Sequence, residues 1–318
     1  MTASSNNNGR AYEYIFLVTL ANSIRQFRSA SVLEDSCYNA SKEAWEKVNK
    51  SEQKDLRLEA EAAIDTLFGL EPMMIEPTDD EMVLKIQSDQ NGEKGDVRDI
   101  VVSRSCVRWE IGLSLKHNHF AVKHSRLSPT IDFGEKWYGV PCSDKYWQTV
   151  NPIFDYLSAE KDKDTEWKSL ANKDNAVYVP VLKAFIHEIG TAKRNNPDVP
   201  RRLIEYLLGA FDFYKVISID EIRATQIQAF NFHGQLNRPS KTRQPVKTIS
   251  IPQFPTEIVS LRFKPNSSTT VEMYLNNGWQ LNFRIHSAST KVETSLKFDI
   301  QIVGLPVAYI YTVTCEWQ

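Results

Sequence analysis

Hydrophobic side chains recur with helical spacing in the N-terminal part of the chain and alternate with polar ones further on. Ala11 to Arg28 carries apolar residues at helical intervals, which predicts a buried first helix. Ser41 to Gly69 predicts a second helical segment, because Gly69 and the following Pro72 form a stop signal. The period then becomes two, and the pattern predicts three strands followed by a short helix: Met82 to Ser88, Val97 to Ser103, Arg108 to Lys116 and Phe120 to Leu127.

The middle of the chain, about residues 145–210, is mostly helical in pattern, and β-rich segments follow it. The predicted strands are Phe213 to Ile219, Thr225 to Phe232, Ile258 to Phe263, Thr270 to Leu275, Trp279 to Ile285, Leu296 to Val303 and Ala308 to Thr314. This order of elements predicts an α+β fold with a mixed sheet flanked by helices. We expect a first domain of residues 1–230, with a helical insertion at about 145–210, and a β-rich C-terminal region of residues 231–318.

Composition places the chain among soluble globular proteins. Its 318 residues have a net charge of −2, with 42% hydrophobic and 25% charged residues, which excludes a disordered chain. The longest largely apolar run, Tyr14 to Ala21, is much shorter than the roughly 20 residues of a membrane span, so we expect a cytoplasmic protein with no membrane contact. The four cysteines lack Cys-x-x-Cys spacing, which argues against a zinc module and against a disulfide framework.

The near-neutral total conceals two basic regions. Ile100 to Ile131 holds five basic residues and three histidines against one acid, Glu110. Ile222 to Thr256 holds five basic residues and no acid. Two such regions suit a protein that binds a polyanion locally, although a solvated surface would give the same pattern.

Candidate chemistry lies on the predicted strands after Gly95. Asp99 begins an apolar strand, and on the next strand alternate residues share one face: Glu110, Gly112, Ser114 and Lys116. If the two strands are neighbours, an acid, a hydroxyl and an amine surround one small volume. Hydrolysis of a phosphodiester needs a hard oxygen ligand for Mg²⁺ and a cation near the developing negative charge. Asp99 and the carbonyl of Leu115 would bind the metal, and Lys116 would be the cation.

This arrangement resembles the PD-(D/E)XK nuclease motif, in which an Asp on one strand is followed by acid-x-Lys on the next. Ser114 stands at the acid position here, and some branches of that superfamily supply the missing carboxylate from a helix. We favour Glu13 on the first helix as catalytic residue and metal ligand. Glu110, on the same strand as Ser114, is the alternative. Glu59 and Glu61 on the second helical segment are further candidates. A first-turn glutamate stabilised by the helix dipole is the competing interpretation of Glu13.

Three histidines follow the motif, at His117, His119 and His124. The surrounding sequence lacks the ββα framework of HNH nucleases, and no fourth ligand stands at a suitable spacing for zinc. We therefore expect these histidines, with Lys123 and Arg126, to contact DNA phosphates.

A longer string, Trp109 to His119 with Ala121 to Ser128, resembles the type II restriction endonucleases of the HaeIII family. The resemblance runs from Gly9 to the C-terminus and includes Asp132-Phe133-Gly134, Trp137, Pro141-Cys142-Ser143, Gly278-Trp279, Phe283 to His286 and Ser295 to Asp299. It implies a prokaryotic, Mg²⁺-dependent enzyme that recognises GGCC in double-stranded DNA and cuts between the central G and C, leaving blunt ends. It also implies a cognate GGCC methyltransferase as a functional partner.

Arginine and lysine donate well to O6 and N7 of guanine, so we expect base reading after Phe230. The candidates are Arg238, Lys241, Arg243, Arg284 and Lys297. A different class stays open, namely a non-cleaving or non-specific DNA-binding or repair module on the same fold, because Ser114 replaces the acid. Two arrangements also stay open for a palindromic, GC-only target: a homodimer on DNA, which the symmetry slightly favours, and a monomer that nicks one strand at a time.

Overall fold

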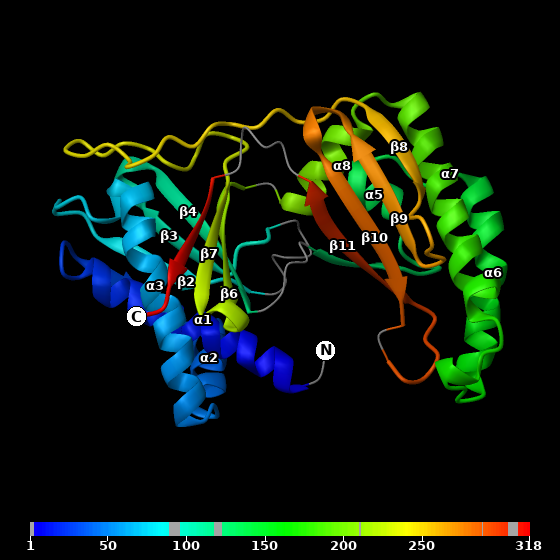
Figure 1. Cartoon of the computed structure of the whole chain (residues 1–318), viewed down its shortest axis with the longest axis horizontal. Helices are drawn as coiled ribbons and strands as arrows, with labels where there is room; N and C mark the ends of the chain where they lie inside the picture. Colours follow the sequence, from blue (N-terminus) through cyan, green and yellow to red (C-terminus); the bar gives the residue numbers. More distant parts are fainter. Residues whose placement is uncertain (1–2, 89–95, 118–122, 210, 288, 305–310) are drawn as a thin grey trace. The chain divides into compact units, whose positions relative to one another are not determined.

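A computed structural model of the chain describes residues 3–88, 96–117, 123–209, 211–287, 289–304 and 311–318 (Figure 1). The connection between the first two predicted strands, at 89–95, and the candidate His119 lie outside these residues. The fold class is the predicted one, because a large mixed sheet is flanked by helices and a second sheet is built from the later strands.

Two compact units make up the chain, and each is discontinuous in sequence. Unit 1 comprises residues 1–120, 209–252 and 308–318, and unit 2 comprises residues 121–208 and 253–307. The structure therefore divides the chain elsewhere than at the predicted boundary near residue 230. The reason is that the last strand pairs with a strand of unit 1, whereas the helical segment packs with the later strands. Strand partners of this kind are set by long-range packing, which local periodicity does not report.

Unit 1 is built on a mixed sheet of order β1-β2-β3-β4-β6-β7-β12. Its strands are β1 (Ala30–Val32), β2 (Met82–Ile86), β3 (Ile100–Arg104), β4 (Trp109–His117), β6 (Phe213–Ile219), β7 (Ala224–Phe230) and β12 (Thr312–Glu316). β1 is parallel to β2 and β4 is parallel to β6, whereas the other neighbouring pairs are antiparallel. β4 is therefore a central strand, with β3 on one side and β6 on the other.

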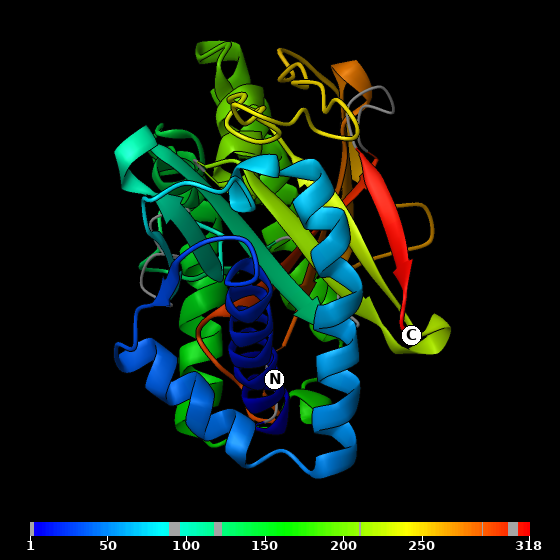
Figure 2. The same cartoon turned by 90° about the vertical axis from the view of Figure 1, so that its left-hand side faces the viewer.

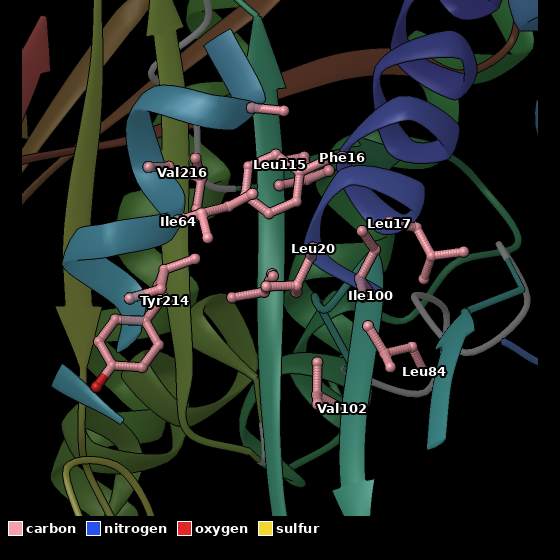
Figure 3. Close-up of a cluster of buried hydrophobic side chains, with 14 of the residues drawn as sticks. Phe16, Leu17, Leu20, Ile64, Leu84, Ile100, Val102, Leu115, Tyr214 and Val216 are labelled. Atoms are coloured by element: carbon pink, nitrogen blue, oxygen red, sulfur yellow. The ribbon is translucent and has the colours of Figure 1, made fainter. Parts of the chain in front are cut away.

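One face of this sheet is covered by α1 (Ala3–Ile24) and α3 (Lys50–Leu70), while α2 (Ser36–Glu46) packs beside α1 (Figure 2). Figure 3 shows side chains of α1 and α3 over side chains of the strands: Phe16, Leu17, Leu20, Ile64, Leu84, Ile100, Leu115 and Val216. Each fully buried side chain of this size contributes about 1.5–3 kcal/mol. Because the helices bury Ile111, Leu113 and Leu115 of β4, the alternate residues of β4 point to the opposite face.

Unit 2 combines antiparallel strands in the order β5-β11-β10-β9-β8 with helices. The strands are β5 (Lys123–Leu127), β8 (Ile258–Phe263), β9 (Thr270–Leu275), β10 (Gln280–His286) and β11 (Leu296–Gly304). The helices are α5 (Phe133–Tyr138), α6 (Asp144–Asp162), α7 (Val179–Asn195) and α8 (Val199–Leu208). Aromatic rings join the two layers: the ring centroid of Trp137 lies 6.3 Å from that of Phe283, and Phe185 lies 5.0 Å from Phe298.

Short helices connect these elements, namely η1 (Pro72–Met74), η2 (Ser105–Val107), η3 (Trp167–Ser169), η4 (Asp174–Tyr178), η5 (Asp220–Ile222) and η6 (Asn276–Gly278). Among the described helices, none combines the length and hydropathy that a bilayer crossing requires.

Most predicted elements are confirmed, and Phe213–Ile219, Ile258–Phe263 and Thr270–Leu275 are strands with the predicted bounds. The helix predicted from Phe120 to Leu127 is wrong where the structure describes it, because Lys123–Leu127 forms β5 and pairs with β11. That pairing satisfies the backbone of the segment and buries Leu127 opposite Leu296. Tertiary contacts have overridden local preference here.

Arg98 fixes the start of β3 against β4. Its guanidinium donates to Asp96 at 2.8 Å and to Glu110 at 2.7 Å, and its Cζ lies 4.0 Å from the ring centroid of Phe211. The side chain runs across Gly112, where an added Cβ would lie 1.9 Å from Arg98 Cδ. A glycine is therefore required at this position of β4, next to the strand end that carries Asp99.

We expect Gly112→Ala to lower the free energy of unfolding by about 1–3 kcal/mol, because the methyl group must displace Arg98 from its two carboxylates. Thermal unfolding measures the effect. Gly9→Ala is the matched control, since its added Cβ meets no described atom within 4 Å apart from its chain neighbours and its own helix, and alanine favours the helix there. Equal unfolding temperatures for Gly112→Ala and the wild type would contradict the assigned role of Arg98.

Candidate active site

Asp99 lies directly before β3, where backbone hydrogen bonds fix its position. Its N–H donates to the carbonyl of Leu113 at 2.8 Å, and its own carbonyl accepts from the N–H of Gln87 at 2.8 Å. The side-chain Oδ2 accepts from the N–H of Leu115 at 2.6 Å, from Ser114 Oγ at 3.3 Å and from Lys116 Nζ at 3.1 Å. The structure therefore brings together the three side chains that the motif singled out, Asp99, Ser114 and Lys116.

The ammonium group of Lys116 lies between two oxygen atoms, donating to Asp99 Oδ2 at 3.1 Å and to the carbonyl of Leu115 at 2.9 Å. Both side chains of this ion pair are about one quarter exposed, at 27% for Lys116 and 25% for Asp99. Within the described part of the chain, no donor lies at hydrogen-bonding distance from Asp99 Oδ1. A carboxylate oxygen and a backbone carbonyl are ligands that Mg²⁺ prefers, so these residues fit a divalent cation.

Ser114 acts on Asp99 as a hydrogen-bond donor. The residue is buried, at 3% exposure, and its hydroxyl points to Asp99 Oδ2. A hydroxyl in this place orients the carboxylate, but it does not supply the second negative charge of an acid-x-Lys motif. Among the described residues, Asp99 belongs to no group of three acidic, histidine or cysteine side chains whose ligand atoms lie close together.

The structure does not bring the predicted replacement carboxylates to Asp99. Glu13 accepts a hydrogen bond from Ser41 of α2 at 3.5 Å, and α1 covers the face of the sheet opposite to Asp99. Glu110 shares the face of Lys116 but forms a 2.7 Å ion pair with Arg98. The physical reason is position: α1 holds Glu13 on the other face of the sheet, and Glu110 pairs with Ser103 of β3, four residues along β4 from Ser114.

The other two candidates lie on α3, on the helix-covered face. Glu59 is buried beside His117, and Glu61 is exposed.

Lys215 is a further candidate residue that the sequence did not single out. The parallel pairing of β4 with β6 sets Lys215 opposite Ser114, on the same face of the sheet. Lys215 is only 4% exposed. Burial, and to a smaller extent the nearby positive charge of Lys116, lower the pKa of its amine to about 7. The available signal was a lysine in the middle of an otherwise apolar strand, Phe213–Ile219.

His117 lies on the helix-covered face and not at the predicted DNA-facing rim. Its Nδ1 is 2.9 Å from Ser218 Oγ and 3.4 Å from Glu59 Oε2, and its Nε2 is 3.2 Å from Asp220 Oδ2. The Glu59 carboxylate raises the pKa of His117. The prediction placed it with Lys116, but adjacent residues of a strand point to opposite faces.

Several predicted DNA-contacting residues share the polar face of the sheet in unit 2. Strand register sets Lys297 opposite Arg126 and Arg284 opposite Asp299, away from the aromatic rings that face the helices. Lys297 Nζ lies 3.7 Å from Asp299 Oδ1, and Arg126 Nη1 donates to Ser295 Oγ at 2.9 Å. Lys123 and His124 are residues of β5, but the structure does not describe their side chains.

Three other candidates, Arg238, Lys241 and Arg243, are exposed on the segment after β7. Buried carboxylates hold the backbone of this segment: Glu71 accepts from the N–H of Asn237, and Glu76 accepts from that of Lys241 at 2.7 Å. Because these acids bind main-chain amides, the basic side chains remain exposed at the surface. Burial raises the pKa of Glu71 to about 7.

Comparisons with known proteins show which family the chain belongs to. The sequence model of the HaeIII restriction endonuclease family matches residues 9–306. The type II restriction enzyme HaeIII of Haemophilus aegyptius is 47% identical over 319 residues, which cover 100% of both chains. No solved structure matches the chain. The chain, with Asp99, Ser114 and Lys116 gathered at one point of its central sheet, belongs to the HaeIII restriction endonuclease family, whose members are type II site-specific deoxyribonucleases.

Proposed function

We propose that the protein binds double-stranded DNA at GGCC and hydrolyses both strands between the central G and C, leaving blunt ends, with Mg²⁺ as the metal. Family membership supports the target and the position of the cut. The single observation that carries the chemistry is Lys116 Nζ, which lies 3.1 Å from Asp99 Oδ2 and 2.9 Å from the Leu115 carbonyl. The two oxygens are metal ligands in this proposal, and the amine is the cation.

In this proposal Asp99 and the Leu115 carbonyl hold Mg²⁺, which when bound acidifies water and neutralises phosphate charge. Ser114 and the N–H of Leu115 keep the Asp99 carboxylate in position by donating to Oδ2. Lys116 donates to the phosphoryl oxygens as their negative charge grows in the transition state. Lys215 adds a second amine on the same face, opposite Ser114, where its protonated form would attract the phosphate.

DNA contacts are assigned in this proposal to two surfaces of the described chain. One is the exposed basic segment with Arg238, Lys241 and Arg243, and the other is the polar strand face with Arg126 and Lys297. We further propose that two chains bind one palindrome, so that each chain cuts one strand. A methyltransferase that modifies GGCC would protect the DNA of the same cell.

A second candidate function is a DNA-binding module on the same fold that does not cleave. The observation that favours it is Ser114 at the acid position, with no described group of three metal-binding side chains at Asp99.

Wild-type protein should cut a plasmid into the fragments that GGCC sites define, in Mg²⁺ only. Lys116→Met and Asp99→Asn should lower the cleavage rate at least about 10²-fold while binding in Ca²⁺ is kept, because both act on the reacting phosphate. Gel electrophoresis of time points measures the rates. Lys42→Met, at an exposed position of α2, is the matched control.

Other outcomes of the plasmid experiment are equally clear. If Lys116→Met and Asp99→Asn cleaved DNA at the wild-type rate, the assignment of these two residues to the active site would be wrong. A band shift without cutting would favour the non-cleaving module, and a smear would mean a nuclease without sequence preference. Nicked circles that accumulate before linear DNA would support a monomer that cuts one strand at a time.

Lys215→Met should slow cleavage about tenfold or more and stabilise the fold near neutral pH. Burial disfavours the ammonium form, so folding releases a proton from Lys215 between its folded pKa of about 7 and its unfolded pKa of about 10.4. The wild type therefore loses stability as the pH falls through this window, and methionine does not. Urea unfolding should give a larger gain for Lys215→Met at pH 7 than at pH 10, with Lys42→Met unchanged. Equal gains at both pH values would contradict the burial argument.

Alanine substitution of a base-reading residue should change which mismatched sites are cut, at a cost of about 1–3 kcal/mol in binding. Loss of a phosphate contact should weaken all sequences alike and lower the salt slope by about one. The variants to compare are those at Arg238, Lys241, Arg243, Arg284 and Lys297. Lys168→Ala, at an exposed ion pair with Glu166, is the control. If all five variants act uniformly on every site, base reading lies elsewhere in the chain.

A further inference from the structure

A second polar centre lies in unit 1, on the face of the sheet opposite to Asp99. It is a pocket of about 460 Å³ beside α3, the end of β4 and the turn between β6 and β7. The lining includes His117, Glu59 and Asp220, which come from these three elements. The proposed DNA cleavage uses none of these side chains, so their arrangement needs its own explanation.

The imidazole of His117 lies between two carboxylates. Glu59 Oε2 is 3.4 Å from Nδ1, and Asp220 Oδ2 is 3.2 Å from Nε2. One potential ligand atom from each of the three side chains can be chosen so that all lie within 4.8 Å of one another. A single cation binds one ring nitrogen, and it can reach all three residues when the carboxylate of Glu59 turns from Nδ1 towards Nε2, since ligand bonds to imidazole and carboxylate are about 2.0–2.2 Å long.

Glu59 is the clearest sign of a missing ligand. Its side chain is 1% exposed, and Oε2 accepts no hydrogen bond from any group in the described part of the chain. A buried carboxylate oxygen without a donor is costly unless a cation approaches it. The nearest cationic group is the imidazole of His117, whose Nδ1 lies 3.4 Å from Oε2, and Glu59 lines the pocket together with His117 and Asp220.

The charge of the pocket favours a cation. Glu52, Asp55, Glu59 and Asp220 line it, and the basic side chains of its lining are His117 and Arg223. The guanidinium of Arg223 already has two partners. Its Cζ lies 5.1 Å from the ring centroid of Trp317, and its Nη1 lies 3.7 Å from Asp55 Oδ1. The acidic side chains thus outnumber the basic ones, which gives the interior a negative potential.

We propose that His117, Glu59 and Asp220 bind a divalent transition-metal cation of the Zn²⁺ type, distinct from the Mg²⁺ assigned to Asp99. One imidazole and two carboxylates suit Zn²⁺, whereas Mg²⁺ prefers ligands that are all oxygen. Ser218 Oγ, 2.9 Å from Nδ1, holds the imidazole in orientation as outer partners of metal-bound histidines do. The ion ties α3 and the β6–β7 turn to β4 at the residue that follows Lys116.

The test is a calorimetric titration of Zn²⁺ into the full-length protein, without DNA or Mg²⁺. The wild type should bind one equivalent that His117→Gln and Asp220→Asn lose or bind at least about tenfold more weakly. Asp99→Asn is the matched control and should keep this equivalent, because Asp99 faces the other side of the sheet. Zn²⁺ should also raise the unfolding temperature of the wild type and leave that of Asp220→Asn unchanged.

Two results would overturn the proposal. One is a wild type that binds no Zn²⁺, and the other is Zn²⁺ binding that both His117→Gln and Asp220→Asn keep, as a thiol site such as the exposed Cys106 would. Asp220 is 51% exposed at a turn, so its variant should fold even if His117→Gln does not. Visible absorption of Co²⁺ in place of Zn²⁺ gives an independent readout, because nitrogen ligation by His117 would be missing from the spectrum of His117→Gln.

Discussion

A single carboxylate oxygen, Oδ2 of Asp99, joins the start of β3 to the end of β4 and gathers the groups that the proposed chemistry needs. It accepts from the Leu115 amide at 2.6 Å and from Lys116 Nζ at 3.1 Å. The N–H of Leu115 therefore donates to Asp99, and the carbonyl of Leu115 accepts the second hydrogen bond of Lys116 Nζ. Arg98, which crosses Gly112 to reach Glu110, holds the two strands in the register that this arrangement requires.

The balance of charge around Asp99 explains why the site suits a phosphate. Ser114 brings a hydroxyl where related motifs have an acid, and Lys215 brings a second amine from β6. Lys116 and Lys215 place two amines on the face of the sheet that carries Asp99, so this face has a positive potential when both amines are protonated. Burial of Lys215 opposes its protonation, and the negative charge of a bound phosphate would offset that cost. Stability and activity are thus set against each other at this residue.

Sequence reasoning succeeded where the relevant spacing was local. Asp99, Ser114 and Lys116 could be placed together because strand alternation and a short connection fix their relation. Lys215 could not, because its position beside Ser114 depends on the pairing of β4 with β6 across about one hundred residues of intervening chain. Glu13 was favoured because an acid among apolar residues can face inward, but helical periodicity does not say which buried partner such an acid meets. The alternation of side chains along a strand already implies that His117 and Lys116 point to opposite faces. The prediction ended the strand at Lys116, whereas β4 continues to His117.

The most direct measurement is a crystal structure of the protein with a short duplex that carries one GGCC site, in Ca²⁺ to suppress cleavage. We expect a Ca²⁺ ion bound to the Asp99 carboxylate and the Leu115 carbonyl, with Lys116 Nζ moved from those oxygens to the phosphate between the central G and C. A scissile phosphate bound away from Asp99 and Lys116, or Ca²⁺ held there by a different set of ligands, would contradict it.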